Sequence, residues 1–176
     1  DVLCPNTVEL SHTTFVYDGK VKSPSVTVKD SAGHVLDAGS YTVSYSGNKN
    51  VGQASVTVTF LGNYEGSITK TFTIVPKGTS ISKLTAGKKG FLAKWKKQSA
   101  QTSGYEIQYS TSSKFTKKTT GTTTVKKSGT TSSKVNKLKA KKKYYVRVRT
   151  FKTVKIGGKT TKLYSGWSKA KSVRTK

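Results

Sequence analysis

The clearest pattern in the chain is a strict alternation of apolar and polar positions over residues 144–151. One set is Tyr144, Val146, Val148 and Thr150, and the other is Tyr145, Arg147, Arg149 and Phe151. A period of two residues predicts a β-strand with one buried face and one wet face. We expect the first set in a core and the second set, Phe151 included, on an outer face.

Shorter alternations of the same kind recur along the chain between turn residues. In the first half they are centred on residues 26–28, 41–45, 54–60 and 68–74, and in the second half on residues 91–95 and 105–109. Phe115 is expected to close the second core, and residues 116–134 predict edge strands whose register the sequence leaves open. No window has helical periodicity, so the predicted fold class is all-β, as two tandem antiparallel β-sandwiches.

Charge divides the chain at the same place as the pattern. Residues 1–76 carry five lysines against six acids, a net charge of −1, whereas residues 77–176 carry 28 basic residues against Glu106 alone, a net charge of +27. Two halves of such different charge indicate two domains. We therefore predict domains at 1–76 and 77–176.

The first half resembles a bacterial surface Ig-like repeat of the MBG-like type. The residues that carry the resemblance are Tyr17-Asp18-Gly19-Lys20, Tyr41-Thr42-Val43, Asn48-Lys49-Asn50-Val51-Gly52 and Gly62-Asn63-Tyr64. Ser40 stands where such repeats usually have an acid. The resemblance implies a non-catalytic stalk or adhesive unit of an exported Gram-positive protein.

The second half resembles a fibronectin type III domain. Leu138 followed by Tyr144 and x-Val-x-Val-x-Thr matches the strand F of that family with its lead-in, and Trp95 matches its buried strand-B tryptophan. The resemblance implies that the Tyr144 hydroxyl caps backbone at the corner of the sheet. It also implies a last strand that begins at Ser165 and continues through Val173.

The sequence predicts no catalytic residue, cofactor or metal site, and we expect no enzyme. Cys4 has no partner for a disulfide within the chain, and we expect it to pack as a small apolar residue. His12 and His34 stand alone among Thr, Ser and Gly, which predicts loop or surface positions. Glu106 is the one acid of the second half, so a pair of carboxylates is lacking there.

Two constellations remain. Glu106 and Gln108 should lie across from Arg147 and Arg149, which we interpret as a surface ion pair worth about 0–1 kcal/mol. The Ser-Gly-Trp-Ser stretch at 165–168 is similar to the Trp-Ser repeat of cytokine-receptor fibronectin domains, where arginines stack between aromatic rings. That similarity implies stacking of Arg147, Arg149 and Trp167, and we expect it to stabilise the domain rather than to bind a ligand.

Two functions follow from these patterns. The first is a non-catalytic spacer or adhesive module pair at the C-terminal end of a larger bacterial protein, extracellular on a Gram-positive cell surface and monomeric. The alternative is a polyanion binder whose partner is an anionic cell-wall polymer such as teichoic acid, an acidic glycan or nucleic acid. Its candidate contacts are Lys94, Lys96, Lys97, Lys141, Lys142, Lys143, Arg147 and Arg149. Specific nucleic-acid recognition is not expected, because lysine lacks the planar fork that reads guanine, and no membrane span is predicted.

Overall fold

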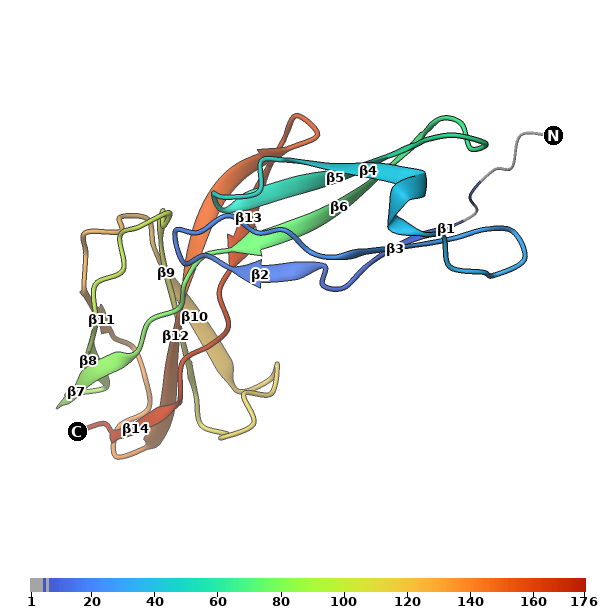
Figure 1. Ribbon diagram of the computed structural model, residues 1–176. Helices are drawn as coiled ribbons and strands as arrows, with labels where there is room; N and C mark the ends of the chain where they lie inside the picture. Colours follow the sequence, from blue (N-terminus) through green and yellow to red (C-terminus); the bar gives the residue numbers. More distant parts are fainter. Residues whose placement is uncertain (1–4, 6) are drawn as a thin grey trace. The chain divides into compact units, whose positions relative to one another are not determined.

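A computed structural model describes residue 5 and residues 7–176 (Figure 1). Cys4, for which we expect a packing role, lies outside the described residues. The chain divides into two compact units, unit 1 up to Val75 and unit 2 over Pro76–Lys176. The described residues form fourteen strands and a single 3₁₀ turn, η1 (Ala38–Ser40), so the predicted all-β fold class is confirmed.

Unit 1 contains two sheets. Its larger sheet has the strand order β2 (Thr14–Val16), β6 (Ser67–Val75), β5 (Gly52–Phe60) and β4 (Tyr41–Ser46). The smaller sheet pairs β1 (Thr7–Leu10) with β3 (Val26–Lys29). All pairs are antiparallel except β2 with β6, which is parallel.

The core of unit 1 follows the predicted alternation. Along β5, Ala54, Val56, Val58 and Phe60 are buried while the residues between them are more exposed. Val28 packs against this row from the smaller sheet, and Phe72 of β6 contacts Phe15 edge-on with 5.6 Å between ring centroids. Period-two burial therefore builds a one-sided core, as expected for antiparallel sheets with a wet face.

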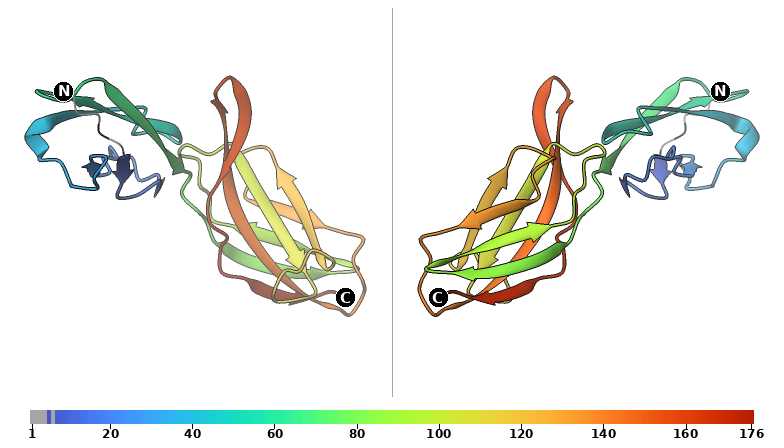
Figure 2. Two further views of the ribbon diagram at one scale, coloured as in Figure 1. Left: turned by 90° about the vertical axis from the view of Figure 1, so that its right-hand side faces the viewer. Right: turned by 90° about the vertical axis from the view of Figure 1, so that its left-hand side faces the viewer.

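Unit 2 is an antiparallel sandwich of two sheets (Figure 2). Its larger sheet has the order β10 (Thr120–Val125), β9 (Gly104–Ser110), β12 (Lys143–Ile156) and β13 (Lys159–Tyr164), with β14 (Lys171–Arg174) paired to the first part of β12. Its smaller sheet has the order β11 (Ser132–Val135), β8 (Gly90–Trp95) and β7 (Ile81–Gly87). Residues 116–134 thus contain all of β10, which belongs to the larger sheet, and most of β11, which belongs to the smaller sheet.

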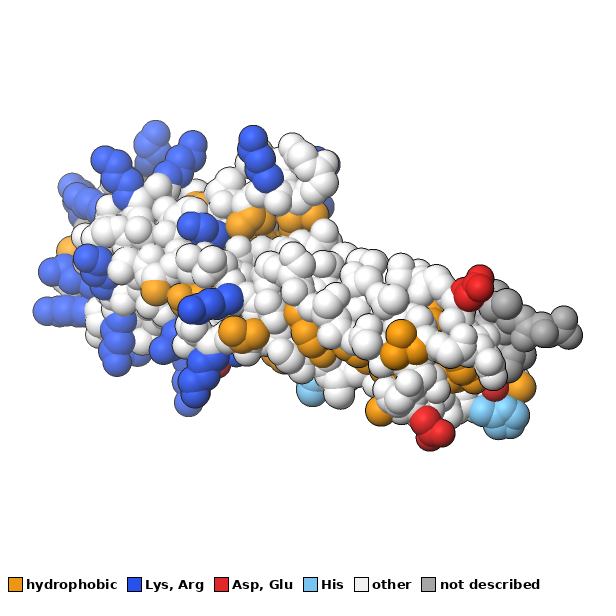
Figure 3. All heavy atoms as spheres, turned by 45° about the horizontal axis from the view of Figure 1, so that its top comes forward, with side chains coloured by type: hydrophobic (Ala, Val, Ile, Leu, Met, Phe, Trp, Pro, Cys, Tyr) orange, Lys and Arg blue, Asp and Glu red, His pale blue; other side chains and the backbone are white. Residues whose placement is uncertain are grey.

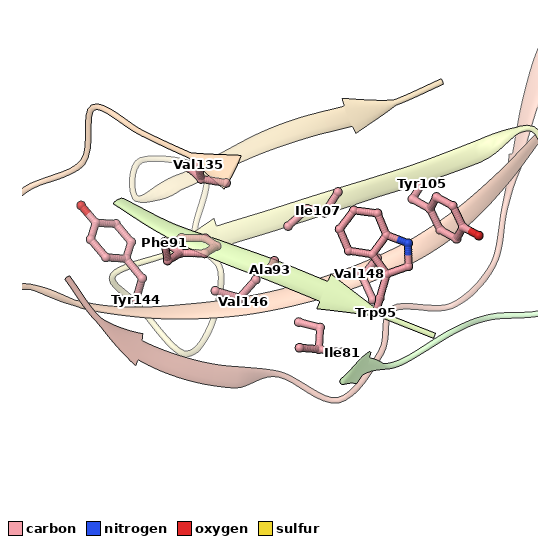
Figure 4. Close-up of a cluster of buried hydrophobic side chains, with 10 residues drawn as sticks. All are labelled: Ile81, Phe91, Ala93, Trp95, Tyr105, Ile107, Val135, Tyr144, Val146 and Val148. Carbon is pink, nitrogen blue, oxygen red and sulfur yellow. The ribbon is translucent and has the colours of Figure 1, made fainter. Parts of the chain in front are cut away.

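The core of unit 2 contains the two residues on which the family resemblance rests (Figure 4). Trp95 is 3% exposed and lies beside Tyr105, with 5.2 Å between ring centroids. Tyr144 lies beside Phe91 at the other end of the core, and its hydroxyl accepts a hydrogen bond of 3.1 Å from the amide of Lys139. The predicted backbone cap by Tyr144 is therefore confirmed.

Two expectations from the sequence, for Phe115 and for the last strand, are wrong, and the face of Phe151 is right although its exposure is not. Phe115 does not enter the core of unit 2, because the loop that carries it leaves the larger sheet on the outer side, where its ring meets Arg147. Phe151 lies on the outer face as predicted, but it is only 2% exposed, because Tyr164 and Lys162 cover it. The last strand is interrupted: Ser165 and Ser168 bond to β12 through their amides, but residues 165–170 are not strand, and β14 begins at Lys171.

Candidate functional site

Side chains on the outer face of the larger sheet of unit 2 form a stack in which aromatic rings and guanidinium groups alternate. From one end to the other the order is Phe115, Arg147, Trp167, Arg149 and Tyr164, which we call the arginine ladder. The guanidinium carbon of Arg147 lies 4.0 Å from the Phe115 ring centroid and 4.6 Å from that of Trp167. That of Arg149 lies 4.3 Å from Trp167 and 3.7 Å from Tyr164. Trp167 is thus sandwiched between the two arginines.

The sequence places the ladder through strand geometry. Arg147 and Arg149 are two residues apart on β12 and so project from the same face. The segment after β13 is fixed along β12 by two serines: the amides of Thr150 and Val148 donate to the hydroxyls of Ser165 and Ser168, each at 3.0 Å. These bonds replace regular strand pairing and hold Trp167 between the arginines.

The arginines are also fixed at their edges by neighbours on β9. Nε and Nη2 of Arg149 donate to Oε2 of Glu106 at 2.9 and 2.6 Å, and the same atoms of Arg147 donate to Oε1 of Gln108 at 2.9 and 2.6 Å. The Tyr164 hydroxyl donates to the other Glu106 oxygen at 3.2 Å. The predicted proximity of these β9 and β12 residues is confirmed by the strand register, in which Arg149 faces Glu106 and Arg147 faces Gln108.

The interpretation of Glu106 and Arg149 as a surface ion pair is wrong. Glu106 is 8% exposed, because it lies under the stacked rings and its neighbouring strands. A charge removed from water this far needs its partner, and loss of one member costs far more than at a surface pair. The pair is therefore part of the packed structure of unit 2.

Burial shifts two pKa values within the ladder. Desolvation, and then the positive charge of Arg149, lowers the pKa of Arg147 below its ordinary value. Desolvation, and then the charge and the hydrogen bond of Glu106, raises the pKa of Tyr164 above its ordinary 10.0. At neutral pH the tyrosine is neutral, so its hydroxyl can donate its hydrogen bond to Glu106.

The stack continues past Tyr164 to the end of β12. The Phe151 ring lies 6.2 Å from Tyr164, and the ammonium of Lys162 lies 4.6 Å from the Phe151 centroid. Sequence reasoning missed Phe115 and Tyr164 as members. The signal for Tyr164 was its position three residues before Trp167. Nothing in the local sequence identifies Phe115 as a member, because its position depends on the path of the β9–β10 loop, where Phe115 itself has a φ of 51°.

The lysines named from the sequence do not form one site. Lys94 lies exposed on the smaller sheet, and Lys96 and Lys97 follow the end of β8. Lys141 and Lys142 precede β12 and Lys143 begins it. They lie at the opposite end of the sandwich, because the start of β12 pairs with the end of β9, whereas Trp95 at the end of β8 lies beside Tyr105 at the start of β9. Arg147 and Arg149 are engaged in the ladder. In Figure 3 the blue Lys and Arg side chains gather on one part of the molecule, and the visible acids lie mostly elsewhere.

Groups suited to metal binding do not converge within the described part of the chain. His34 lies 81% exposed with its Nδ1 3.3 Å from Oδ2 of Asp30, and His12 contacts the Phe15 ring. Both are surface residues of unit 1. In the described residues no helix is long and apolar enough to cross a bilayer.

Comparison with known proteins places the chain in a family. The fibronectin type III domain model matches residues 75–165, which is more than half of the chain. The chain belongs to the fibronectin type III family. Domains of this family are commonly structural or adhesive, typically extracellular and typically non-catalytic.

Solved structures also resemble the chain, at low identity. The FN1–FN3 domains of chicken CNTN1 match at 15% identity over 98% of this chain and 67% of that one, with a TM-score of 0.47. A crystallised segment of titin matches at 15% identity over 97% of this chain and 66% of that one, with a TM-score of 0.37. The chain thus spans about two thirds of each. No curated protein sequence matches it.

Proposed function

We propose that the chain is a non-catalytic pair of spacer or adhesive modules on the surface of a Gram-positive bacterium, at the C-terminal end of a larger exported protein. In this proposal unit 1 is an Ig-like repeat of the MBG-like type and unit 2 is the fibronectin type III module. The family of unit 2 supports this role, and so do the surface-repeat motifs of residues 7–75.

The arginine ladder is the observation that carries the spacer role. Both faces of Trp167 are covered by guanidinium groups, and the Nε and Nη2 donors of both arginines are used within the chain. A contact between a guanidinium group and an aromatic ring contributes about 0.5–2 kcal/mol, depending on its desolvation. The ladder therefore joins β9, β12, β13 and two loops across the outer face and resists their separation, which suits a module that must stay folded outside the cell.

Pulling the 176-residue chain by its two ends in a single-molecule experiment tests the spacer role. We expect two unfolding events, one for each unit, and Trp167→Ala should lower the unfolding force of only one of them. Val16→Ala, an exposed apolar position of unit 1, is the control and should leave both forces unchanged. If Trp167→Ala leaves both forces unchanged, the ladder does not strengthen the module and the proposal loses its main support.

The proposed location has a separate test. An antibody raised against the 176-residue chain should label intact cells of the source organism, and brief protease treatment of those cells should remove the signal. Labelling that requires lysis of the cells would contradict a surface location.

A second candidate function, polyanion binding by unit 2, is favoured by one observation. Its 28 basic residues face a single acid, Glu106, and that acid is already engaged by Arg149. The positive surface is therefore not neutralised within the unit, and the exposed lysines remain available as point charges. Binding of this kind weakens steeply with salt, because each neutralised anionic group releases counterions.

Titration of the chain with teichoic acid, a sulfated glycan and mixed-sequence DNA at two salt concentrations tests this second function. We expect binding at low salt that falls with a steep log–log slope. Absence of binding at physiological salt would leave the spacer role alone. Strong binding to one ligand alone, with an affinity that does not depend on salt concentration, would contradict attraction by dispersed charge.

A further inference from the structure

The loops at one end of unit 2 bring together lysines from four separate parts of the sequence. The register of Tyr145 with Ser110 places the end of β9, and hence the β9–β10 loop, beside the start of β12. The pairing of Lys143 with Arg174 brings the end of β14 to the same place. Figure 2 shows these segments around the end marked C, together with the β7–β8 turn. We call this region the basic end.

Backbone hydrogen bonds fasten these loops to one another. The amide of Lys89, in the β7–β8 turn, donates to the carbonyl of Lys176 at 2.9 Å, and the amide of Leu138 donates to the carbonyl of Lys89 at 2.9 Å. Thr175 is buried, and its hydroxyl donates to the carbonyl of Lys139 at 2.6 Å while accepting from the amide of Lys142 at 3.0 Å. The β7–β8 turn, the residues before β12 and the C-terminal segment are therefore joined to one another.

The backbone is in the left-handed region at four non-glycine residues of this end. They are Lys89, Phe115, Lys137 and Lys141, with φ between 47° and 61°. A non-glycine residue adopts this conformation at a cost, and it persists only where surrounding contacts determine it. The lysine side chains of these loops are exposed.

The basic end contains twelve basic side chains and no acidic one. Three lie in the β9–β10 loop, five between Val135 and Tyr144, two in the β7–β8 turn and two after Val173, and all are exposed. Glu106 lies four residues before Ser110 on β9 and is bonded to Arg149. Positive charge is thus concentrated here without a compensating group.

A hollow of about 400 Å³ lies within the basic end. Lys118 and Lys139 line it from the β9–β10 and β11–β12 loops, and Thr111, Thr119 and Tyr109 contribute hydroxyl groups and an aromatic ring. Its volume falls in the range of small-ligand sites, about 300–1,000 Å³. Ammonium groups beside hydroxyls suit a ligand that carries both an anionic group and hydroxyls.

We propose that the basic end is the binding site for a flexible phosphodiester polymer of polyols, with one polyol phosphate unit in the hollow and neighbouring phosphates on the surrounding lysines. This inference rests on the second function proposed for unit 2 and gives it a site and a ligand class. A flexible chain suits the geometry because the lysines come from four loops around one end, which a chain can follow and a rigid duplex cannot.

The aromatic residues argue against single-stranded nucleic acid. Proteins that bind single strands present exposed rings on which bases stack. At the basic end Tyr144 is 6% exposed, Tyr109 packs edge-on against Phe91, and the ammonium of Lys143 lies over the Tyr145 ring at 5.0 Å. Each of these rings is buried or already contacts another side chain of unit 2.

A calorimetric titration tests the proposal. It measures binding of the full chain to a poly(glycerol phosphate) oligomer of defined length over a series of salt concentrations. The site variant replaces Lys118, Lys139, Lys141 and Lys142 by glutamine. The control variant makes the same change at Lys96, Lys97, Lys126 and Lys127, which are equally exposed but lie at the other end of the sandwich. Both variants lose four positive charges, so a difference between them reports position alone.

We expect the site variant to bind at least about tenfold more weakly and to lose about 2–3 in log–log salt slope, since each phosphate contact on a flexible strand contributes about 0.7. The control variant should change much less. Equal weakening of both variants would overturn the site while leaving polyanion binding intact. Absence of wild-type binding would overturn both. Tighter binding of a sulfated glycan or of DNA than of poly(glycerol phosphate) would overturn the ligand class.

Discussion

Units 1 and 2 share a fold class but differ in how far side chains cover their outer surfaces. Unit 1 leaves Val16, Val21, Val35 and Leu61 exposed, with exposed fractions from 43% to 63%. The carboxylates of its Lys22–Asp18 and Lys29–Glu9 ion pairs are also exposed. Unit 2 covers the outer face of its larger sheet with the arginine ladder and buries its one acid there. The comparison shows that a sandwich of this kind can be held by its core alone or by its core together with an ordered outer face.

The largest expected effect tests whether the two cores are independent. Phe72 in unit 1 and Phe91 in unit 2 are 2% and 1% exposed, so Phe72→Ala and Phe91→Ala should each lower the free energy of unfolding by about 3–5 kcal/mol. Each change should affect only the unit that contains it. Urea unfolding followed by NMR signals assigned to each unit measures this. A shift of both transitions by either variant would show that the units unfold together.

The next effect separates the ladder from an ordinary surface. Arg149→Met leaves the Glu106 carboxylate buried without its partner, and we expect a loss of about 2–4 kcal/mol from unit 2, since the arginine keeps some exposure. Arg147→Met is the matched control, because its partner Gln108 is neutral, and it should cost about 1–2 kcal/mol. Equal losses would show that the buried charge of Glu106 does not matter.

A smaller effect isolates the stacking contacts themselves. Trp167→Ala should destabilise unit 2 and leave unit 1 unchanged, and the loss should shrink when Arg147 and Arg149 are already replaced by alanine. We expect a coupling of about 0.5–2 kcal/mol per guanidinium contact. Chemical denaturation of the members of this double-mutant cycle measures it. Strictly additive losses would mean that the rings and the guanidinium groups do not stabilise each other.

The smallest effect contrasts the two units through pH. The pKa of Tyr164 is raised, so its contribution to the stability of unit 2 is present below pH 10 and is lost as the pH rises through the folded-state pKa. In unit 1 the pKa of Asp30 is lowered, chiefly by the backbone hydrogen bond from His34, so its contribution is lost as the pH falls below the ordinary aspartate value of 3.8.

Thermal unfolding across pH, with Tyr164→Phe and Asp30→Asn as controls, checks these signs. Tyr164→Phe should remove part of the alkaline destabilisation of unit 2, and Asp30→Asn should remove part of the acid destabilisation of unit 1. Profiles unchanged by either substitution would show that other groups govern the pH dependence.

Local pattern was enough to predict much of this protein. Alternation placed the buried residues of β5 and the core-facing residues of β12, because a strand directs successive side chains to opposite faces. The spacing of Leu138 and Tyr144 was sufficient to predict the backbone cap by the Tyr144 hydroxyl. The positions of Arg147 and Arg149 were sufficient to predict Glu106 and Gln108 across from them. Each of these depends on contacts that one strand or one strand pair defines.

The tertiary structure alone decided what depends on loops and on neighbouring sheets. Phe115 has the apolar character of a core residue, and only the path of the β9–β10 loop places it on the outer face. Alternation predicted the face of Phe151, but only the cover of Tyr164 and Lys162 buries it there. The basic end is another example, since its lysines are up to 88 residues apart, from Lys88 to Lys176, and meet only when four chain segments close on one another. Periodicity records which way a side chain points, but which distant segment covers it is set by packing of the whole unit.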